Sequence, residues 1–146
     1  MTTDVLATML LCDAAQVVGG KLYMLGGGWT RVTAPNRPIN MSLAIIVHVP
    51  WSLANERMKI EVGLRDDDGE PVVIGDRAIS SAGAIEVGRA AGLKAGERIN
   101  VPMAMNFNNI QLAPGGYVWE CLIEDRAAAR WPFRVNPASE PAPGSG

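Results

Sequence analysis

Residues 41–49 read MSLAIIVHV, and this stretch decides the fold. Its odd-numbered positions all carry large apolar side chains, whereas the even positions carry Ser42, Ala44, Ile46 and His48. Successive side chains of an extended strand point to opposite sides, so this alternation places every large apolar residue except Ile46 on one face. The stretch therefore predicts a strand with one face in a hydrophobic core.

The same alternation recurs in four further segments, which are residues 58–65, 98–107, 117–124 and 130–135. Turn-forming sequences separate them: Gly19-Gly20, Asp66-Asp67-Asp68-Gly69 and Pro114-Gly115-Gly116. Short strands with regular turns are typical of an all-β domain. We expect an antiparallel β-sandwich, immunoglobulin-like or C2-like, of about seven to nine strands that occupies residues 1–136.

Local features refine this expectation. Residues 5–12 are expected to form a strand that continues through a hairpin at Gly19-Gly20-Lys21 into residues 22–25, although a helical face through the first segment stays an alternative. The alternation slips after Asn108-Asn109, which predicts a bulge or bend, and Pro102 predicts an edge strand because it has no amide hydrogen. Residues 137–146 carry Pro, Ala, Ser and Gly without periodicity and are expected to be a disordered tail.

Composition limits the classes of partner. The chain has 146 residues, of which 48% are hydrophobic, with a net charge of −2 and a pI near 5.4. Its 13 Lys and Arg residues are scattered, which argues against nucleic acid and anionic membranes as partners. No stretch is long enough to span a membrane and the first residues lack a signal-peptide pattern, so we expect a cytoplasmic protein. Cys12 and Cys121 are then expected to be free, buried thiols; a single disulfide in a secreted protein is the alternative.

Several motifs resemble a known family. They are LCDAAQ at 11–16, GKLY at 20–23 with LGGGW at 25–29, VPW at 49–51 with NER at 55–57, LRDDDGEPV at 64–72, and LAPGGY at 112–117 with PFRV at 132–135. Together they resemble a family of short, uncharacterised all-β proteins from actinobacteria and their phages. The resemblance implies no activity and no catalytic residues, and it would make the protein virion-associated if a phage encodes it.

A second resemblance concerns the fold alone. Pro114-Gly115-Gly116-Tyr117, followed by Trp119 and Cys121, is similar to the entry to strand F of immunoglobulin-like domains. In those domains a tyrosine hydroxyl returns to the backbone a few residues upstream.

Two loop sequences invite a ligand-binding interpretation. Gly26-Gly27-Gly28 lacks the Lys and Ser/Thr of a phosphate loop and precedes β-prone residues, so a strand bend with close backbones is favoured. Asp66, Asp67 and Asp68 do not match an EF-hand, and a hairpin is favoured there. A calcium site in which Asp76 and Glu56 join these acids is the alternative.

Catalytic patterns are scarce. His48 is the only histidine, which leaves one possible base for a Ser-His-Asp triad and too few ligands for a typical zinc site. The chain has no Gly-x-Ser-x-Gly elbow. A pair of carboxylates for glycoside hydrolysis stays open, because such a pair requires only spatial proximity.

The tryptophans divide by position. Trp119 and Trp131 lie on apolar faces and are expected in the core, and Trp29 lies in the core or at an edge. Trp51 ends a strand and opens a loop, where it either caps the domain or anchors a partner. We select no catalytic, cofactor-binding or metal-binding residue and no cofactor. The candidates for contact with a partner or ligand are Trp51, Asn55, Arg57, Asp66, Asp67 and Asp68.

The expected function is a non-catalytic module for protein–protein interaction or assembly, with another protein or a second copy of the chain as partner. The first alternative is a carbohydrate- or small-ligand-binding domain, which would hold Trp51 or the Asp66–Asp68 loop in a cleft. The second alternative is an unrecognised hydrolase, which would hold His48 within hydrogen-bond reach of a Ser, Thr or Cys.

Overall fold

The structure, a computed structural model, describes residues 5–34 and 38–137. In these residues it has twelve strands and one short 3-10 helix. None of their helical segments has the length or apolar character needed to cross a bilayer. The expected all-β class is confirmed. The expected tail lies outside the described residues, apart from Pro137, which ends the last strand.

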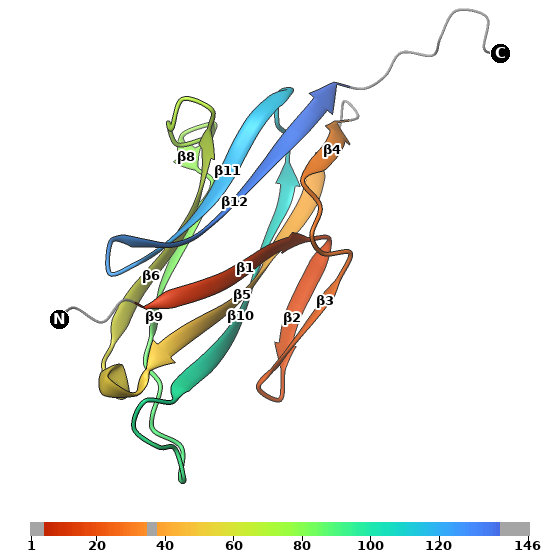
Figure 1. Ribbon diagram of the computed structural model, residues 1–146. Helices are drawn as coiled ribbons and strands as arrows, with labels where there is room; N and C mark the ends of the chain where they lie inside the picture. The colour runs from red at the N-terminus through yellow and green to blue at the C-terminus, as the bar shows by residue number, and fades with distance from the viewer. Residues whose placement is uncertain (1–4, 35–37, 138–146) are drawn as a thin grey trace, which may run out of the picture.

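The elements follow in chain order as β1 (Leu6–Cys12), β2 (Ala14–Val18), β3 (Lys21–Leu25), β4 (Arg31–Ala34), β5 (Ile39–Pro50), η1 (Trp51–Leu53), β6 (Met58–Asp66), β7 (Val73–Ile74), β8 (Arg77–Ala78), β9 (Ser80–Ile85), β10 (Arg98–Ile110), β11 (Gly115–Ile123) and β12 (Arg126–Pro137). They form a three-stranded sheet of order β1-β5-β10, a five-stranded sheet of order β4-β12-β11-β6-β9, and the hairpins β2-β3 and β7-β8 (Figure 1).

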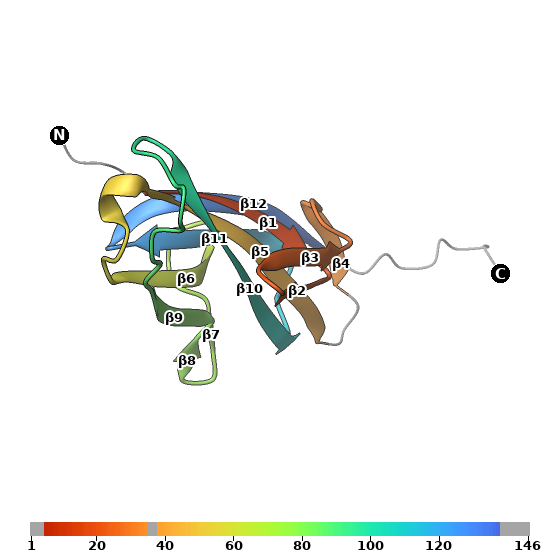
Figure 2. The same cartoon turned by 90° about the horizontal axis from the view of Figure 1, so that it is seen from below.

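β5 is the central strand of the three-stranded sheet. It pairs antiparallel with β1 on one side and β10 on the other, so both of its backbone edges are satisfied. Its odd-numbered residues from Met41 to Val49 are all fully buried, as the alternation predicted. On the opposite face Ala44 is also buried, because Ala15 and Leu22 pack against it. Both residues belong to the β2–β3 hairpin, which lies beside β5 (Figure 2).

The five-stranded sheet supplies the other wall of the core. Trp119 on β11 is fully buried, and its ring centroid lies 4.5 Å from that of Phe107 on β10. Leu64 and Trp131 are its direct partners on the two neighbouring strands. A single hydrophobic cluster therefore contains residues of both large sheets.

β4 and β12 pair although they lie about a hundred residues apart in the sequence. Arg31 to Ala34 pair in parallel with Arg134 to Pro137. Next to this pair, the indole N–H of Trp131 donates to the carbonyl oxygen of Trp29 at 3.0 Å. The ring of Trp29 meets Phe133 edge-on at 5.8 Å, so its position at the sheet edge is held by packing.

The expected number of about seven to nine strands is wrong, because the described residues form twelve. The strands not foreseen are short or lack alternating large apolar residues: β2, β4, β7, β8 and β9. Gly19 and Gly20 do form a hairpin turn, with φ of 58° and 75°. The strand that enters this turn is β2, however, and residues 6–12 pair instead with β5.

Three local expectations are confirmed. The β5–β10 register shifts between Phe107 and Ile110, and Asn109 there has a φ of 58°. Pro102 lies on β10, which is an edge strand. The hydroxyl of Tyr117 donates to the carbonyl oxygen of Ala113 at 2.6 Å, which is the return to upstream backbone that the sequence indicated.

Both cysteines are free and fully buried. Burial raises the pKa of the Cys121 thiol to about 11. The pKa of Cys12 is also raised, first by burial and then by the charge of Asp13. Both groups are therefore protonated, and the folded protein shields them from reagents that attack thiolates.

The first prediction concerns Trp119. Replacing Trp119 with Ala is expected to lower the free energy of unfolding by about 3–5 kcal/mol, through lost burial and a cavity. Trp119→Phe should cost clearly less, because the indole N–H has no hydrogen-bond partner in the described residues and its removal deletes a buried unsatisfied donor. Urea denaturation of both variants measures this. Equal costs for Ala and Phe would contradict the account.

The second prediction concerns alkaline pH. Thiols of the unfolded chain ionise near about pH 8.5, whereas the folded chain keeps the Cys121 proton up to about pH 11. The unfolded state therefore binds fewer protons in this window, and the free energy of unfolding should fall as the pH rises from about 9 toward 11. Urea denaturation at several pH values measures the slope. Cys121→Ala should reduce the slope without abolishing it, because the raised pKa of Cys12 acts in the same direction. An unchanged slope in that variant would show that other groups cause it.

Candidate functional site

Three of the expected contact residues lie at one end of the domain, around η1. The guanidinium carbon of Arg89 lies 3.5 Å from the centroid of the Trp51 ring, and an Arg89 nitrogen donates to the Trp51 carbonyl at 3.4 Å. The amide of Asn55, which has a φ of 69°, donates to the carbonyl oxygen of Val87 at 2.7 Å. Trp51 thus packs under a loop of its own chain, and Arg57 beside it is exposed.

The acidic residues form a turn after β6. Oδ1 of Asp66 accepts hydrogen bonds from the backbone amides of Asp68, at 2.9 Å, and Glu70, at 3.0 Å. Asp67 lies over the backbone of Gly116, in the space that a Cβ at Gly116 would fill. The turn therefore uses Asp66 to hold its own backbone. In the part of the chain that the structure describes, no three His, Cys, Asp or Glu residues gather in a way that could hold a metal ion.

The structure does not bring the six expected residues together. Trp51, Asn55 and Arg57 precede β6, whereas Asp66 ends this strand and Asp67 follows it. A strand of nine residues at about 3.3 Å per residue separates the two groups by roughly 30 Å. They form two separate surfaces.

Sequence reasoning missed a hydrogen-bonded row on the outer face of the three-stranded sheet. Oγ1 of Thr8 lies 2.8 Å from Nε2 of His48, and Nδ1 of His48 lies 2.8 Å from Oδ1 of Asn100. An amide oxygen only accepts, so Nδ1 donates to Asn100, and in the neutral imidazole Nε2 then accepts the proton of the Thr8 hydroxyl. Strand alternation did place His48 on the polar face, but only the pairing of β1, β5 and β10 identifies its neighbours.

The β2–β3 hairpin carries a group of exposed apolar residues that the sequence did not single out. Its inner face rests on the three-stranded sheet, where Ala15 is buried beside Cys12 and Ala44. Its outer face presents Val18, Tyr23 and Leu25, which are 53%, 52% and 73% exposed. We call these three residues the outer hairpin face. Val17 and Met24, each 40% exposed, pair with Leu22 and Ala15 and lie on the inner face.

A hollow adjoins the outer hairpin face. It has a volume of about 420 Å³ and is lined by residues 14–16 of β2 and 23–25 of β3. A two-stranded hairpin is only marginally stable alone, and this one depends on its inner contacts with the sheet. The outer apolar side chains make no comparable contribution to the fold, because they face solvent.

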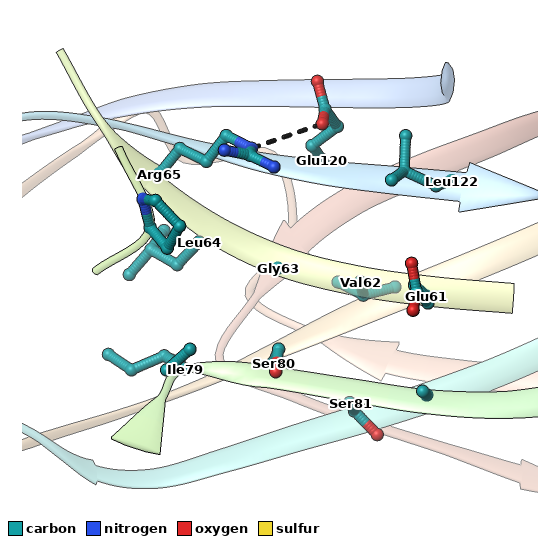
Figure 3. A pocket seen from close by; sticks show the side chains of 13 residues that line it. Glu61, Val62, Gly63, Leu64, Arg65, Ile79, Ser80, Ser81, Glu120 and Leu122 are labelled. Carbon is teal, nitrogen blue, oxygen red and sulfur yellow. Dashed lines mark ion pairs between the residues drawn. The ribbon is translucent and has the colours of Figure 1, made fainter. Parts of the chain in front are cut away.

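The outer face of the five-stranded sheet carries polar side chains and a small hollow. Glu120 lies between two arginines, 3.4 Å from Arg65 and 3.9 Å from Arg130. Beside them a hollow of about 230 Å³ opens over β6 and β9, where Gly63 and Ser80 supply little side-chain volume (Figure 3). Exposed ion pairs of this kind contribute little stability, and they leave few unpaired charges on this face.

Comparison with known proteins gives a family and a fold. A family model described as "Family of unknown function (DUF6941)" matches residues 7–136. No curated protein matches the chain. Among solved structures, the chain is similar to Pseudomonas fluorescens alkylpurine DNA glycosylase AlkC bound to DNA containing an abasic site analog. The TM-score is 0.50 at 10% identity over 90% of this chain. The chain spans 30% of that protein's length, and the likeness concerns the fold alone.

Proposed function

The chain belongs to this family of unknown function, and we propose that it is a non-catalytic module through which one protein binds another. The observation that carries the proposal is the outer hairpin face. Val18, Tyr23 and Leu25 lie together on two paired strands and point away from the fold. Clustered apolar exposure of this kind marks interaction surfaces, whereas single exposed apolar residues are common.

Energetics favour a protein surface as the partner of this face. Burying a Val or Leu side chain stabilises by about 1.5–3 kcal/mol relative to leaving it exposed. Tyr23 adds an aromatic ring with a polar hydroxyl, a type of residue enriched at interfaces. Lys21 and Gln16 lie on the same side of the hairpin and supply polar groups at its margin. An apolar centre with a polar margin is the usual composition of a protein–protein contact.

The proposal includes an immunoglobulin-like sandwich as the scaffold. The Tyr117–Ala113 hydrogen bond supports it, as does the single core that the two large sheets share. Two free, buried cysteines support a reducing compartment such as the cytoplasm. A role in a phage- or prophage-encoded assembly is also part of the proposal, and it rests on the resemblance of the turn motifs alone.

Two other binding functions rank lower. A carbohydrate- or small-ligand site would hold Trp51 or the Asp66–Asp68 turn in a cleft, but Arg89 packs against the Trp51 ring and Asp66 holds the backbone of its own turn. Nucleic acid is not proposed as partner, although the structural relative was solved with DNA. The net charge is −2, and Glu120 forms ion pairs with Arg65 and Arg130 on the outer face of the five-stranded sheet.

One observation favours a second candidate function, ester hydrolysis. The Thr8–His48–Asn100 row has the order of a nucleophile, a base and a group that orients the base. In such a reaction Thr8 Oγ1 would add to the ester carbonyl carbon while its proton passed to His48 Nε2. His48 would return this proton to the departing alkoxide, and water would then hydrolyse the acyl-threonine in the same way.

The surroundings of this row argue against catalysis. It lies across an open sheet face, and Thr8 and Asn100 are exposed. Neither they nor His48 line any of the hollows described above. Backbone amides of β5 are engaged on both sides, so this strand offers no free pair of donors for an oxyanion.

The third prediction tests this candidate. Hydrolysis of p-nitrophenyl acetate by the wild-type protein should stay within twofold of that by Thr8→Val, because the row is not expected to be catalytic. His48→Gln serves as the second variant, and thermal melts show that each variant is folded. A loss of about 10²-fold or more in both variants would contradict the proposed non-catalytic function and establish the hydrolase.

The fourth prediction tests the outer hairpin face. A photoreactive p-benzoylphenylalanine at position 25 should form a covalent adduct with a second protein in cells of the source organism. The same group at Gln111, which is exposed in the loop after β10, is the matched control and should not form that adduct. The double variant V18K with Y23K should abolish the position-25 adduct and leave the melting temperature unchanged within about 2 °C. The same adduct from both positions, or none from either, would contradict the proposal.

A further inference from the structure

β9 is an unusual edge strand. It lies at the end of the five-stranded sheet and pairs only with β6 in the part of the chain that the structure describes. Its first five residues, Ser80 to Ala84, are all exposed, on both faces of the sheet. Its sequence SSAGAI has no charge and no proline, and its pairing with β6 runs without a bulge. Figure 3 shows Ser80 and Ser81 on this strand beside β6.

The other sheet edges carry the features that normally prevent strand pairing. β10 holds Pro102 and a register shift before Ile110, and Arg98 starts it. β4 is only four residues long and begins with Arg31. β1 is half-buried and touches β12 of the opposite sheet. Within the described residues, β9 is the edge strand of the two large sheets that has no proline, charge or irregularity and whose first five residues are all exposed.

The free backbone groups of β9 are regularly spaced. The amide of Leu64 donates to the carbonyl oxygen of Ile79 at 3.0 Å, just before the β6–β9 ladder begins with Gly63 opposite Ser80. This bond sets the phase of the antiparallel ladder and makes Gly63 and Ser80 a non-hydrogen-bonded pair. Every second residue after Ile79 then bonds to β6. The residues between them, Ser80, Ala82 and Ala84, direct their N–H and C=O groups toward the open edge.

This spacing is self-complementary. We propose that β9 pairs antiparallel with β9 of a second copy of the chain, about a two-fold axis at Ala82. In that register Ala82 meets its own counterpart and Ser80 meets Ala84, so every outward backbone group finds a partner. The three residues on each strand would form about six hydrogen bonds. The small side chains let the backbones approach without obstruction, and the two five-stranded sheets become continuous.

Charge at the ends of β9 supports a second copy as the occupant. Arg77 precedes the strand and Glu86 follows it, and both are exposed. Antiparallel pairing brings the start of one strand to the end of the other. Arg77 of each copy therefore lies near Glu86 of the other, at both ends of the ladder, where opposite charges attract.

The β9–β9 contact gives the proposed interaction module a second partner, another copy of the chain. It uses a different part of the fold from the outer hairpin face. β9 belongs to the edge of the five-stranded sheet, whereas β2–β3 lies on the three-stranded sheet. A protein that dimerises but yields no adduct from position 25 would overturn only the proposed function. A monomer that yields the adduct would overturn only the present proposal.

The fifth prediction is tested by sedimentation equilibrium at about 5–200 μM. The wild-type chain should be a dimer at the upper end of this range. Ala82→Lys and Ala82→Glu should each be monomeric, because each places two like charges across the two-fold axis. An equimolar mixture of these two variants should recover the dimer. Gln111→Lys, with the same charge change at an exposed loop, should behave as the wild type.

Disulfide formation tests the register. Paired residues of this class have Cα atoms about 5.5 Å apart, within the range of a disulfide. Ala82→Cys should therefore form an intermolecular disulfide under mild oxidation, whereas Ser80→Cys should not, because it faces Ala84 of the second copy. The buried Cys12 and Cys121 do not interfere. A monomeric wild type, dimeric charge variants, or equal cross-linking at positions 80 and 82 would each overturn the proposal.

Discussion

The contact between Trp119 and Phe107 is the constraint on which the rest of the structure depends. It joins β11 of one large sheet to β10 of the other across the core. Side chains alternate along a strand, so turning these rings inward also decides what faces solvent. Glu120 must then point outward, where it meets Arg65 and Arg130. On the other sheet, the same rule directs Asn100 outward toward His48.

The sequence predicted the parts of the fold in which alternation is strong. β5, β6 and β11 have large apolar residues at every second position, and their buried faces are the predicted ones. β9 escaped prediction because serine, alanine and glycine give no contrast between its faces. β4 escaped because its partner lies about a hundred residues further along the chain. Neither local composition nor periodicity indicates which distant strand a segment pairs with.

The candidate site likewise has features that the sequence predicted and features that only strand pairing reveals. Turn chemistry correctly predicted a turn from Asp66 to Gly69, in which the carboxylate of Asp66 accepts from backbone amides. Trp51 was also a candidate contact residue, and the nine residues of β6 separate it from Asp66. Conversely, Thr8, His48 and Asn100 are distant in sequence and meet only because β1, β5 and β10 pair in one register. The register of these strands depends on tertiary contacts, and it is not evident from the alternation within any one segment.

The parallel pairing of β4 with β12 has a consequence for biosynthesis. β4 leaves the ribosome early, but its hydrogen-bonding partner is the last strand described. At about 5–20 residues per second, translation of the intervening chain takes on the order of ten seconds. During that time the N-terminal strands lack the sheet that covers their apolar face. Folding of this domain is therefore completed only after β12 has been synthesised, and a nascent chain that stalls before residue 126 presents an open core to chaperones and proteases.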